Sequence, residues 1–285
     1  GSFRHESELA SLLMAGIIVN SLILFHLRRA LGRMAVVLVL VALHIGIFLN
    51  NYRTALVGLA CAWVVFLLFS WRMLHTGARM LFVFAGLIVS VFVVFYVDIG
   101  AFLQRMDDIG VLLSQPMKYF VIAEDGGGEA ARGLFSGRIY LINLYLYRFV
   151  SASPEYWIFG LGARSGQEFA GTYAHNQYIW ALVETGIIGF VAFLWWCGRA
   201  VRLTYSVARK GVPEGIVPFA AFVAVLVWSL ATMPFEDMRA MMFIGFIIAI
   251  ATKEKALSER RAHLGVKNGR PPGSRSFRRS DPTFV

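Results

Sequence analysis

The stretch HNQYIWALVETGIIGF, residues 175–190, decides the fold, because a titratable histidine stands where an apolar helix of membrane length begins. An ionisable side chain at that depth indicates a functional site. On a straight helix, Gly186 returns to within about 20° of the azimuth of His175, and Gly189 to within about 40°. We therefore predict one helix face with His175 at its outer end and two glycines below it, where a neighbouring helix packs closely. The alternative is an interfacial histidine heading an ordinary span.

The composition around this stretch is that of a membrane protein. The chain has 285 residues, of which 58% are hydrophobic and 15% charged, and its mean hydropathy is +0.65. These values lie outside the range of soluble domains. We predict an all-α integral membrane protein with about seven transmembrane helices. The apolar runs that are long enough to span lie near 8–27, 34–51, 54–71, 80–99, 177–198, 214–232 and 239–252.

The net charge of +10 follows the membrane topology, so it does not indicate a nucleic-acid partner. Most of the basic residues fall in alternate connections: Arg28, Arg29 and Arg33; Arg72 and Arg79; Arg199, Arg202, Arg209 and Lys210; and those from Lys253 onward. Most acidic residues lie elsewhere. The positive-inside rule then places the N-terminus and the segment 100–175 outside and the C-terminus in the cytoplasm.

This topology divides the chain into four parts. Residues 1–99 form the first four transmembrane helices, and residues 100–175 form a large, partly helical outer loop. Residues 176–252 form the last three transmembrane helices. The segment 253–285 is basic and rich in Pro, Gly and Ser, which predicts a disordered cytoplasmic tail next to membrane lipids.

The outer loop divides into three pieces. An apolar period up to Pro116 predicts a helix that lies along the membrane surface. The glycines of EDGGGEAARG, residues 124–133, predict a flexible turn. A second apolar helix follows, with Ser136 as its N-cap and Pro154 after its end. Cys61 and Cys197 fall within predicted spans and are interpreted as core thiols.

Three groups on the outer face stand among hydrophobic neighbours: Arg53, Arg138 and His175. Arginine offers a planar fork of donors to phosphate oxygens, so two arginines beside a histidine describe an anionic ligand and a proton acceptor. Arg53 occupies a tight hairpin in IFLNNYRTALVG, where a small polar residue would satisfy the turn. The alternative for Arg53 is that its side chain reaches lipid headgroups.

Further polar residues on this face are candidates for substrate binding: Asn176, Arg164, Arg148, Glu236 and Asp237. Asn176 is equally well explained as a helix cap, and the two carboxylates as solvated loop residues. Glu184 is assigned to helix packing or a buried polar network. GLGARSG, residues 160–166, is interpreted as a tight turn before His175, because no βαβ context surrounds it. The pattern predicts no metal site, since Asp107 and Asp108 diverge by about 100° on a helix.

Four motifs resemble one family, the O-antigen ligases and polymerases of bacterial envelope polysaccharides. They are AHNQYIWALVETGIIGF after a large outer loop, SGRIYL within that loop, SPEYWIFGLG before the histidine, and NNYRTAL after an upstream span. The resemblance covers about residues 40–230. His175 with Gly186, and Arg138 in the loop, match the ligase pattern. Ligases carry leucine four positions after this arginine, whereas this chain has Ile142, so ligase and polymerase both remain open.

The resemblance implies transfer of a glycan from an undecaprenyl-diphosphate carrier to a hydroxyl of a glycan or lipid A-core acceptor. The reaction takes place at the periplasmic face of the inner membrane and needs no metal or cofactor. His175 then acts as general base, while Arg53 and Arg138 hold the diphosphate. The family has more than seven spans, so either an N-terminal part is missing or the topology is reduced. The rival function is a transporter or flippase of a lipid-linked or anionic solute, whose chief midplane candidate is His44.

Overall fold

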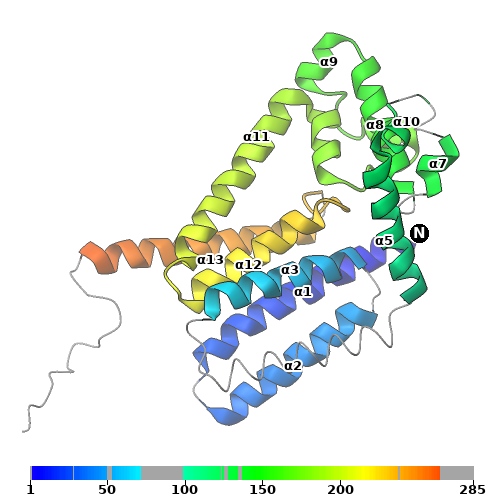
Figure 1. The fold of residues 1–285 in the computed structure, drawn as a ribbon. Coiled ribbons are helices and arrows are strands. Elements are labelled where there is room, and N and C mark those ends of the chain that lie inside the picture. The colour runs from blue at the N-terminus through cyan, green and yellow to red at the C-terminus, as the bar shows by residue number, and fades with distance from the viewer. Residues whose placement is uncertain are drawn as a thin grey trace, which may run out of the picture.

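The computed structural model describes residues 2–27, 29–49, 53–71, 99–122, 124, 128–133, 137–236 and 238–263, and this part of the chain is all helical (Figure 1). The all-α prediction is therefore confirmed for it. The helices in chain order are α1 (Ser2–His26), α2 (Ala30–Leu49), α3 (Arg53–Ser70), α5 (Ile99–Ser114), α6 (Pro116–Tyr119), α7 (Gly128–Gly133), α8 (Arg138–Ser151), α9 (Pro154–Phe159), α10 (Ser165–Ala170), α11 (Gln177–Ala208), α12 (Pro213–Trp228) and α13 (Met238–His263).

Helix α12 lies at the centre of a bundle and contacts α1, α3, α11 and α13, while α2 packs against α1 and α3. Its side chains Phe222 and Val225 are buried in the main core. Trp228, near its end, joins a second core with residues of α1 and α2. On the outside of the bundle, α2 exposes apolar side chains such as Leu31 and Leu38. An apolar periphery around an apolar core suits a bundle that is surrounded by lipid.

The bundle has two distinct ends (Figure 1). The connections α1–α2 and α11–α12 lie at one end, where His26 Nε2 is 3.1 Å from Glu214 Oε1. The loop between α12 and α13 and the small helices α8 to α10 lie at the other end. The charge pattern assigns the α1–α2 and α11–α12 connections to the same side of the membrane. In the structure they lie at the same end of the bundle.

One helix of the described part, α11, is long and apolar enough to cross a membrane, by length and composition. Shorter apolar stretches lie in α1, α2, α3 and α12: Leu12–Leu24, Leu31–Ile47, Ala55–Ser70 and Pro213–Trp228. Six of the predicted runs coincide with helices, α13 included, while residues 80–98 lie outside the described residues. The number of seven spans stays a prediction.

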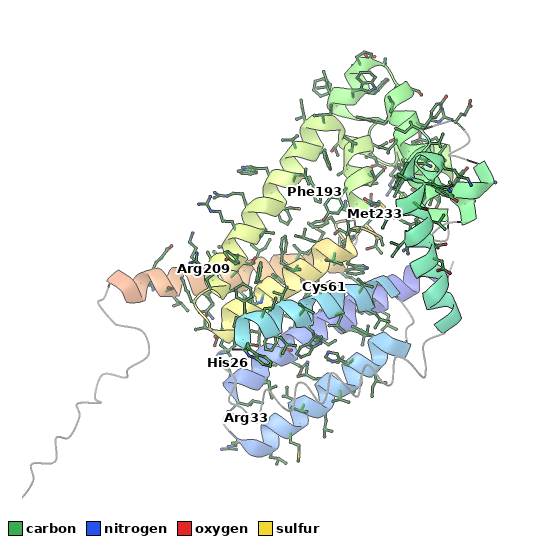
Figure 2. The ribbon with its side chains drawn as sticks, viewed as in Figure 1. His26, Arg33, Cys61, Phe193, Arg209 and Met233 are labelled. Carbon is green, nitrogen blue, oxygen red and sulfur yellow. The ribbon has the colours of Figure 1, made fainter. Side chains whose placement is uncertain are left out.

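Helix α11 folds back on itself at Gly186, whose φ of 66° and ψ of −172° interrupt the helical backbone. We name residues 177–185 the short arm and residues 187–208 the long arm. Tyr178 on the short arm and Phe193 on the long arm meet edge to face, with ring centroids 6.0 Å apart. A straight helix would separate these residues by about 22 Å. Figure 2 shows Phe193 between the two arms.

This fold-back corrects the prediction of one face carrying His175, Gly186 and Gly189. Helical phase does not continue through a residue in a left-handed conformation, so the azimuths on either side are unrelated. A Cβ on Gly189 would meet the side chain of Thr185, across the break, rather than a neighbouring helix. The two glycines therefore shape the turn between the arms.

The outer loop is more helical than the sequence predicts. Helix α7 begins at Gly128, inside the predicted glycine turn. Helix α8 has Gly137 as its N-cap, with a left-handed φ of 80°, while Ser136 lies outside the described residues. Pro154 starts α9 instead of only ending the preceding segment. Its fixed φ and missing N–H suit the first turn of a helix.

The last helix continues into the predicted tail. α13 extends to His263, so residues 253–263 are helical and not disordered, while residues 264–285 lie outside the described part. Lys255 Nζ lies 3.9 Å from Glu259 Oε1, one helical turn away. Such pairs, together with helix-forming Ala, Leu, Lys and Glu residues, favour a helix even where apolar residues become rare. Cys61 and Cys197 are free thiols, as predicted.

Candidate functional site

The segment 171–177 carries His175 to the end of the bundle. His175 has a φ of 50°, a left-handed conformation that is uncommon outside glycine. The residues around it are held tightly, because Ala174 and Gln177 are fully buried. A strained backbone persists where its surroundings impose it, and such residues gather at functional sites.

Asn176 caps the short arm of α11. Its Oδ1 accepts hydrogen bonds from the backbone N–H groups of Tyr178 and Ile179, at 3.0 and 3.1 Å. Its Nδ2 donates to the carbonyl of Leu230 at 2.9 Å. Of the two predicted interpretations of Asn176, the structure supports the helix cap.

Gln177 joins the same segment to the loop between α12 and α13. Its backbone N–H donates to the carbonyl of Ser229 at 2.9 Å. Its Oε1 accepts from the backbone N–H of Phe235 at 3.1 Å. Because Gln177 is buried and bonds at both ends of the loop, the loop that carries Glu236 is fixed beside the segment that carries His175.

Two glycines interlock at the break of α11. A Cβ on Gly186 would meet the backbone of Ile158 and Gly160, and a Cβ on Gly160 would meet the backbone of the short arm. The backbone N–H of Leu161 donates to the carbonyl of Val183 at 2.9 Å. Carbonyls at the end of a helix have no partner within it. The turn 160–162 supplies those partners from outside.

Glu184 continues this contact on the other side of the turn. Its carbonyl accepts from the N–H of Gly162 at 3.1 Å, and its carboxylate accepts from the N–H of Arg164 at 2.8 Å. The residue is only 6% exposed. The interpretation of residues 160–166 as a tight turn is confirmed for its first half, while α10 begins at Ser165. The structure thus shows how Glu184 serves the turn, which the sequence did not specify.

A second group of polar side chains gathers around this turn: Glu184, Glu236, Arg164 and Tyr145. The packed loop withdraws water from the Glu236 carboxylate, although the residue keeps contact with solvent. This loss of hydration, and next the charge of Glu184, raise the pKa of Glu236 to about 7, while Arg164 acts to lower it. Burial and the same two carboxylates raise the pKa of Tyr145 above its usual range. Tyr145 therefore remains a donor and bonds the carbonyl of Thr172 at 2.8 Å.

The positive charge of Arg138 acts on the side chain of His175. Burial lowers the pKa of His175 first, and the charge of Arg138 lowers it further. Both effects disfavour the imidazolium. At neutral pH, His175 is therefore a neutral imidazole beside a guanidinium that begins α8. This pair can accept a proton and hold an anion at the same place.

Three other predicted site residues, Arg53, Asp237 and Arg148, are not brought to His175 by the described part of the structure. Arg53 is the first residue of α3, and its side chain lies outside the described part of the chain, as does Asp237. Arg148 is exposed, with its guanidinium carbon 5.7 Å from the centre of the Phe169 ring. About 15 Å of helix separates it from Arg138. The structure therefore brings Arg138 within electrostatic reach of His175. It likewise brings Arg164 near Glu184 and Glu236. Arg148 lies apart from Arg138.

Two contributors escaped the sequence analysis: Tyr145 and Gln177. Tyr145 is one of several tyrosines on α8, and only its full burial against Gly166 and Phe169 sets it apart. Gln177 is the first residue of α11 and is set apart by its full burial and its bonds to the loop between α12 and α13. The sequence held one indication of this role: Gln177 stands directly before an apolar run, and a side-chain amide that is buried there needs hydrogen-bond partners.

Within the described residues, no group of three or more His, Cys, Asp or Glu side chains could hold a metal ion. The expectation that the site works without metal stays a prediction. The titratable and charged side chains gathered at the site are an imidazole, guanidinium groups and carboxylates.

The fold and the site define an all-helical membrane protein with a polar site at one end of an apolar bundle. A family model described as O-antigen ligase matches residues 35–194, more than half of the chain. The chain therefore belongs to the O-antigen ligase family. The match includes Arg53, Arg138, His175 and the break at Gly186. Comparisons with curated proteins and with solved structures gave no match.

Proposed function

We propose that the protein is a membrane glycosyltransferase that moves a glycan from an undecaprenyl-diphosphate carrier to an acceptor sugar hydroxyl. The acceptor is a growing glycan or a lipid A-core, and the site faces the periplasm at the bacterial inner membrane. The observation that carries the proposal is the pairing of His175 with Arg138. It lies at the end of the bundle opposite the basic connections, where the diphosphate of a lipid-anchored donor would meet it.

The reaction needs one base and one anion binder. The acceptor O–H gives its proton to an imidazole nitrogen of His175 as its oxygen attacks the anomeric carbon of the donor. The bond from that carbon to the diphosphate oxygen breaks, and undecaprenyl diphosphate leaves with the electron pair. Arg138, together with Arg53, neutralises the charge that gathers on the diphosphate. A base of this kind contributes about 10² to 10⁴ in rate, and no metal takes part.

The other site residues take supporting roles in the proposal. Arg164 and Arg148 bind outer parts of the donor, and Glu236 with Asp237 positions the acceptor. Asn176 holds the His175 segment through its cap and its bond to Leu230, so its role moves from substrate contact to positioning.

The alternative, a transporter of a lipid-linked or anionic solute, depends on an ionisable group inside the bundle. His44 Nδ1 lies 2.7 Å from the carbonyl of Leu40, and Trp63 Nε1 donates to His44 Nε2 at 2.9 Å. Both ring nitrogens are therefore engaged between α2 and α3. This supports a packing role for His44 and favours chemistry at the end of the bundle over passage through it.

The decisive experiment uses purified protein in proteoliposomes with a lipid-linked oligosaccharide, with and without a lipid A-core acceptor. A ladder without acceptor identifies a polymerase, and a single capped product identifies a ligase. We expect His175→Ala to lose at least about a hundredfold in rate. His26→Ala, at the opposite end of the bundle, is the control and should keep full activity. Normal transfer by His175→Ala would refute the role of this base.

Arg138 is tested by donor binding. Arg138→Gln should raise the donor concentration needed for half-maximal rate, because a charge-assisted contact to the diphosphate is lost. Arg138→Lys should restore only part of it, since lysine lacks the planar fork. Arg209→Gln, an exposed arginine at the other end, is the matched control. Equal effects of Arg138→Gln and Arg209→Gln would exclude a specific donor contact.

A further inference from the structure

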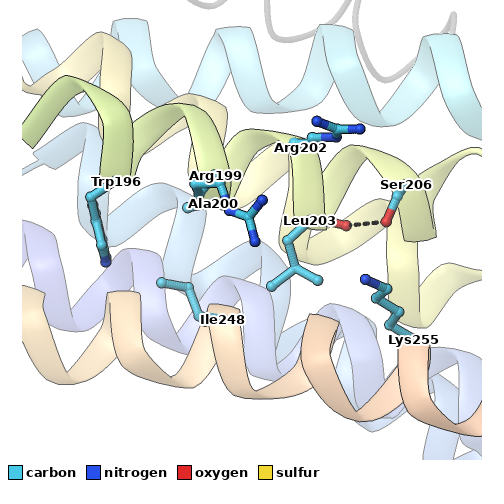
Figure 3. A pocket seen from close by; sticks show the side chains of 8 residues that line it. All are labelled: Trp196, Arg199, Ala200, Arg202, Leu203, Ser206, Ile248 and Lys255. Atoms are coloured by element: carbon cyan, nitrogen blue, oxygen red, sulfur yellow. Dashed lines mark hydrogen bonds between the residues drawn. The ribbon is translucent and has the colours of Figure 1, made fainter. Parts of the chain in front are cut away.

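A cavity with a mainly apolar lining and three cationic side chains lies between the long arm of α11 and α13, away from the site described above. It is open on one side and has a volume of about 470 Å³. The residues that line it are Trp196, Arg199, Ala200, Arg202, Leu203, Ser206, Ile248 and Lys255. Figure 3 shows the side chains of Arg199 and Lys255 reaching into the space between the two helices.

The cavity combines cations and apolar surface in one place. Arg199, Arg202 and Lys255 contribute three positive charges, and none of the eight described lining residues is acidic. Lys255 Nζ lies 3.9 Å from the carboxylate of Glu259, an exposed residue one turn further along α13, which offsets part of its charge, while the two arginines on α11 add theirs. The cavity therefore keeps a positive field.

The apolar part of the lining comes from the same helix faces. Trp196, Ala200 and Leu203 follow the spacing of one face of α11, and Ile248 faces them from α13. The hydroxyl of Ser206, another lining residue, donates to the carbonyl of Leu203 at 2.7 Å. A ligand that fits must carry both an anionic group and hydrocarbon.

The depth of the cavity agrees with such a ligand. Counted from the last residue of α11, Ala208, Arg202 and Arg199 lie about 9 and 14 Å along the long arm. The hydrocarbon core of a bilayer is about 30 Å thick. Helix α11 ends at the end of the bundle opposite the His175 site, so both cations lie in the half of the bilayer on that side, and Trp196, about 18 Å from Ala208, lies deeper.

We propose that this cavity binds one anionic phospholipid of the leaflet opposite the His175 site. The phosphodiester lies between Arg199, Arg202 and Lys255, and the acyl chains lie along Trp196 and Ile248. Cations near such a surface attract anionic lipid, and arginine suits phosphate oxygens. Soluble phosphate would satisfy the cations but leave the apolar lining exposed.

The test uses native mass spectrometry of the full-length protein, delipidated in detergent and titrated with phosphatidylglycerol or phosphatidylcholine. We expect one tightly retained phosphatidylglycerol, and at least about tenfold weaker retention in the variant Arg199→Gln/Arg202→Gln/Lys255→Gln. The control variant Arg209→Gln/Lys210→Gln/Lys253→Gln removes the same charge at the same end of the bundle and should retain the lipid as the wild type does.

Three results would overturn the proposal. Equal losses in the two triple variants would mean that only surface charge attracts lipid. Equal retention of phosphatidylcholine would mean that the headgroup charge is irrelevant. Displacement of the lipid by glycerol phosphate at similar concentration would identify a site for soluble phosphate. The single variant Arg202→Gln, at an exposed residue, provides the same comparison if the triple variant does not fold, and a thermal melt reports on folding.

Discussion

Replacing Gly186 with alanine should break the junction on which the site depends. Gly186 has a φ of 66°, where an L side chain is strained. Its Cβ would also meet the backbone of Ile158 and Gly160, which cannot rotate away as a side chain can. To relieve both problems, the chain must either straighten α11 or separate α9 from it.

The cost has two parts that can be estimated separately. A residue held in a sparsely populated backbone region costs about 1–3 kcal/mol. Overpacking against fixed neighbours costs about another 1–3 kcal/mol. Gly186→Ala should therefore lower the free energy of unfolding by about 2–6 kcal/mol. Because the break also positions the 160–166 turn and Glu184, transfer activity should fall with it.

Gly198 on the long arm gives a matched control. It lies in regular helix, and a Cβ there would meet no atom within 4 Å. Gly198→Ala should leave activity unchanged and stabilise the helix by about 0.5–1 kcal/mol. The assay is a thermal melt of both variants in the same detergent, together with the transfer reaction.

A cross-link tests the geometry directly. In a background with Cys61 and Cys197 replaced by serine, Tyr178→Cys and Phe193→Cys should be joined by a short bifunctional maleimide, because the native rings are 6.0 Å apart. The added Gly186→Ala change should reduce the yield. If Gly186→Ala melted and cross-linked like Gly198→Ala, the fold-back and the interlocked glycines would be wrong.

The other predictions concern pH and one buried hydroxyl. The pKa of His175 lies below 6.5, so the rate of transfer at saturating donor should fall as the pH drops below that value. Arg138→Gln should shift this fall in the pH–rate profile to higher pH, because the positive charge that lowers the pKa of His175 is removed. A profile that does not shift would show that Arg138 does not act on His175. The pKa of Glu236 is about 7 in the folded protein, above the ordinary value of 4.5. The stability that the protonated carboxyl contributes is therefore fully present below pH 4.5 and is lost as the pH rises through 7. Thermal melts from pH 5 to 8 should show this decline in the wild type and a flatter profile in Glu236→Gln. Tyr145→Phe should cost about 1 kcal/mol by denaturant titration, because the bond to Thr172 is lost; an unchanged midpoint would contradict that bond.

Several elements could be predicted because their causes are local. Apolar runs of membrane length become helices because backbone groups in an apolar setting must bond within their own segment. Asn176 caps α11 through its own neighbours in sequence. The charge pattern placed Arg138 and His175 on the same outer face, and the resemblance added their roles.

Contacts between distant segments could not be predicted in this way. The apolar pattern of residues 175–190 is the same for a straight and for a folded-back helix, so Gly186 was assigned to a helix face. Its conformation is decided by Gly160, which fills the space beside it. The bond from Gln177 to Phe235 likewise depends on where the loop after α12 is packed.

The sequence alone determined that this protein is an all-helical membrane protein with its histidine at the head of an apolar helix, because hydrophobicity, charge bias and helix capping act over neighbouring residues. Only the tertiary structure decided that this helix reverses at Gly186 and that the His175 segment is fixed beside the loop between α12 and α13. Those features arise from close packing between segments far apart in the chain, where the shape of one backbone sets what its neighbour can adopt.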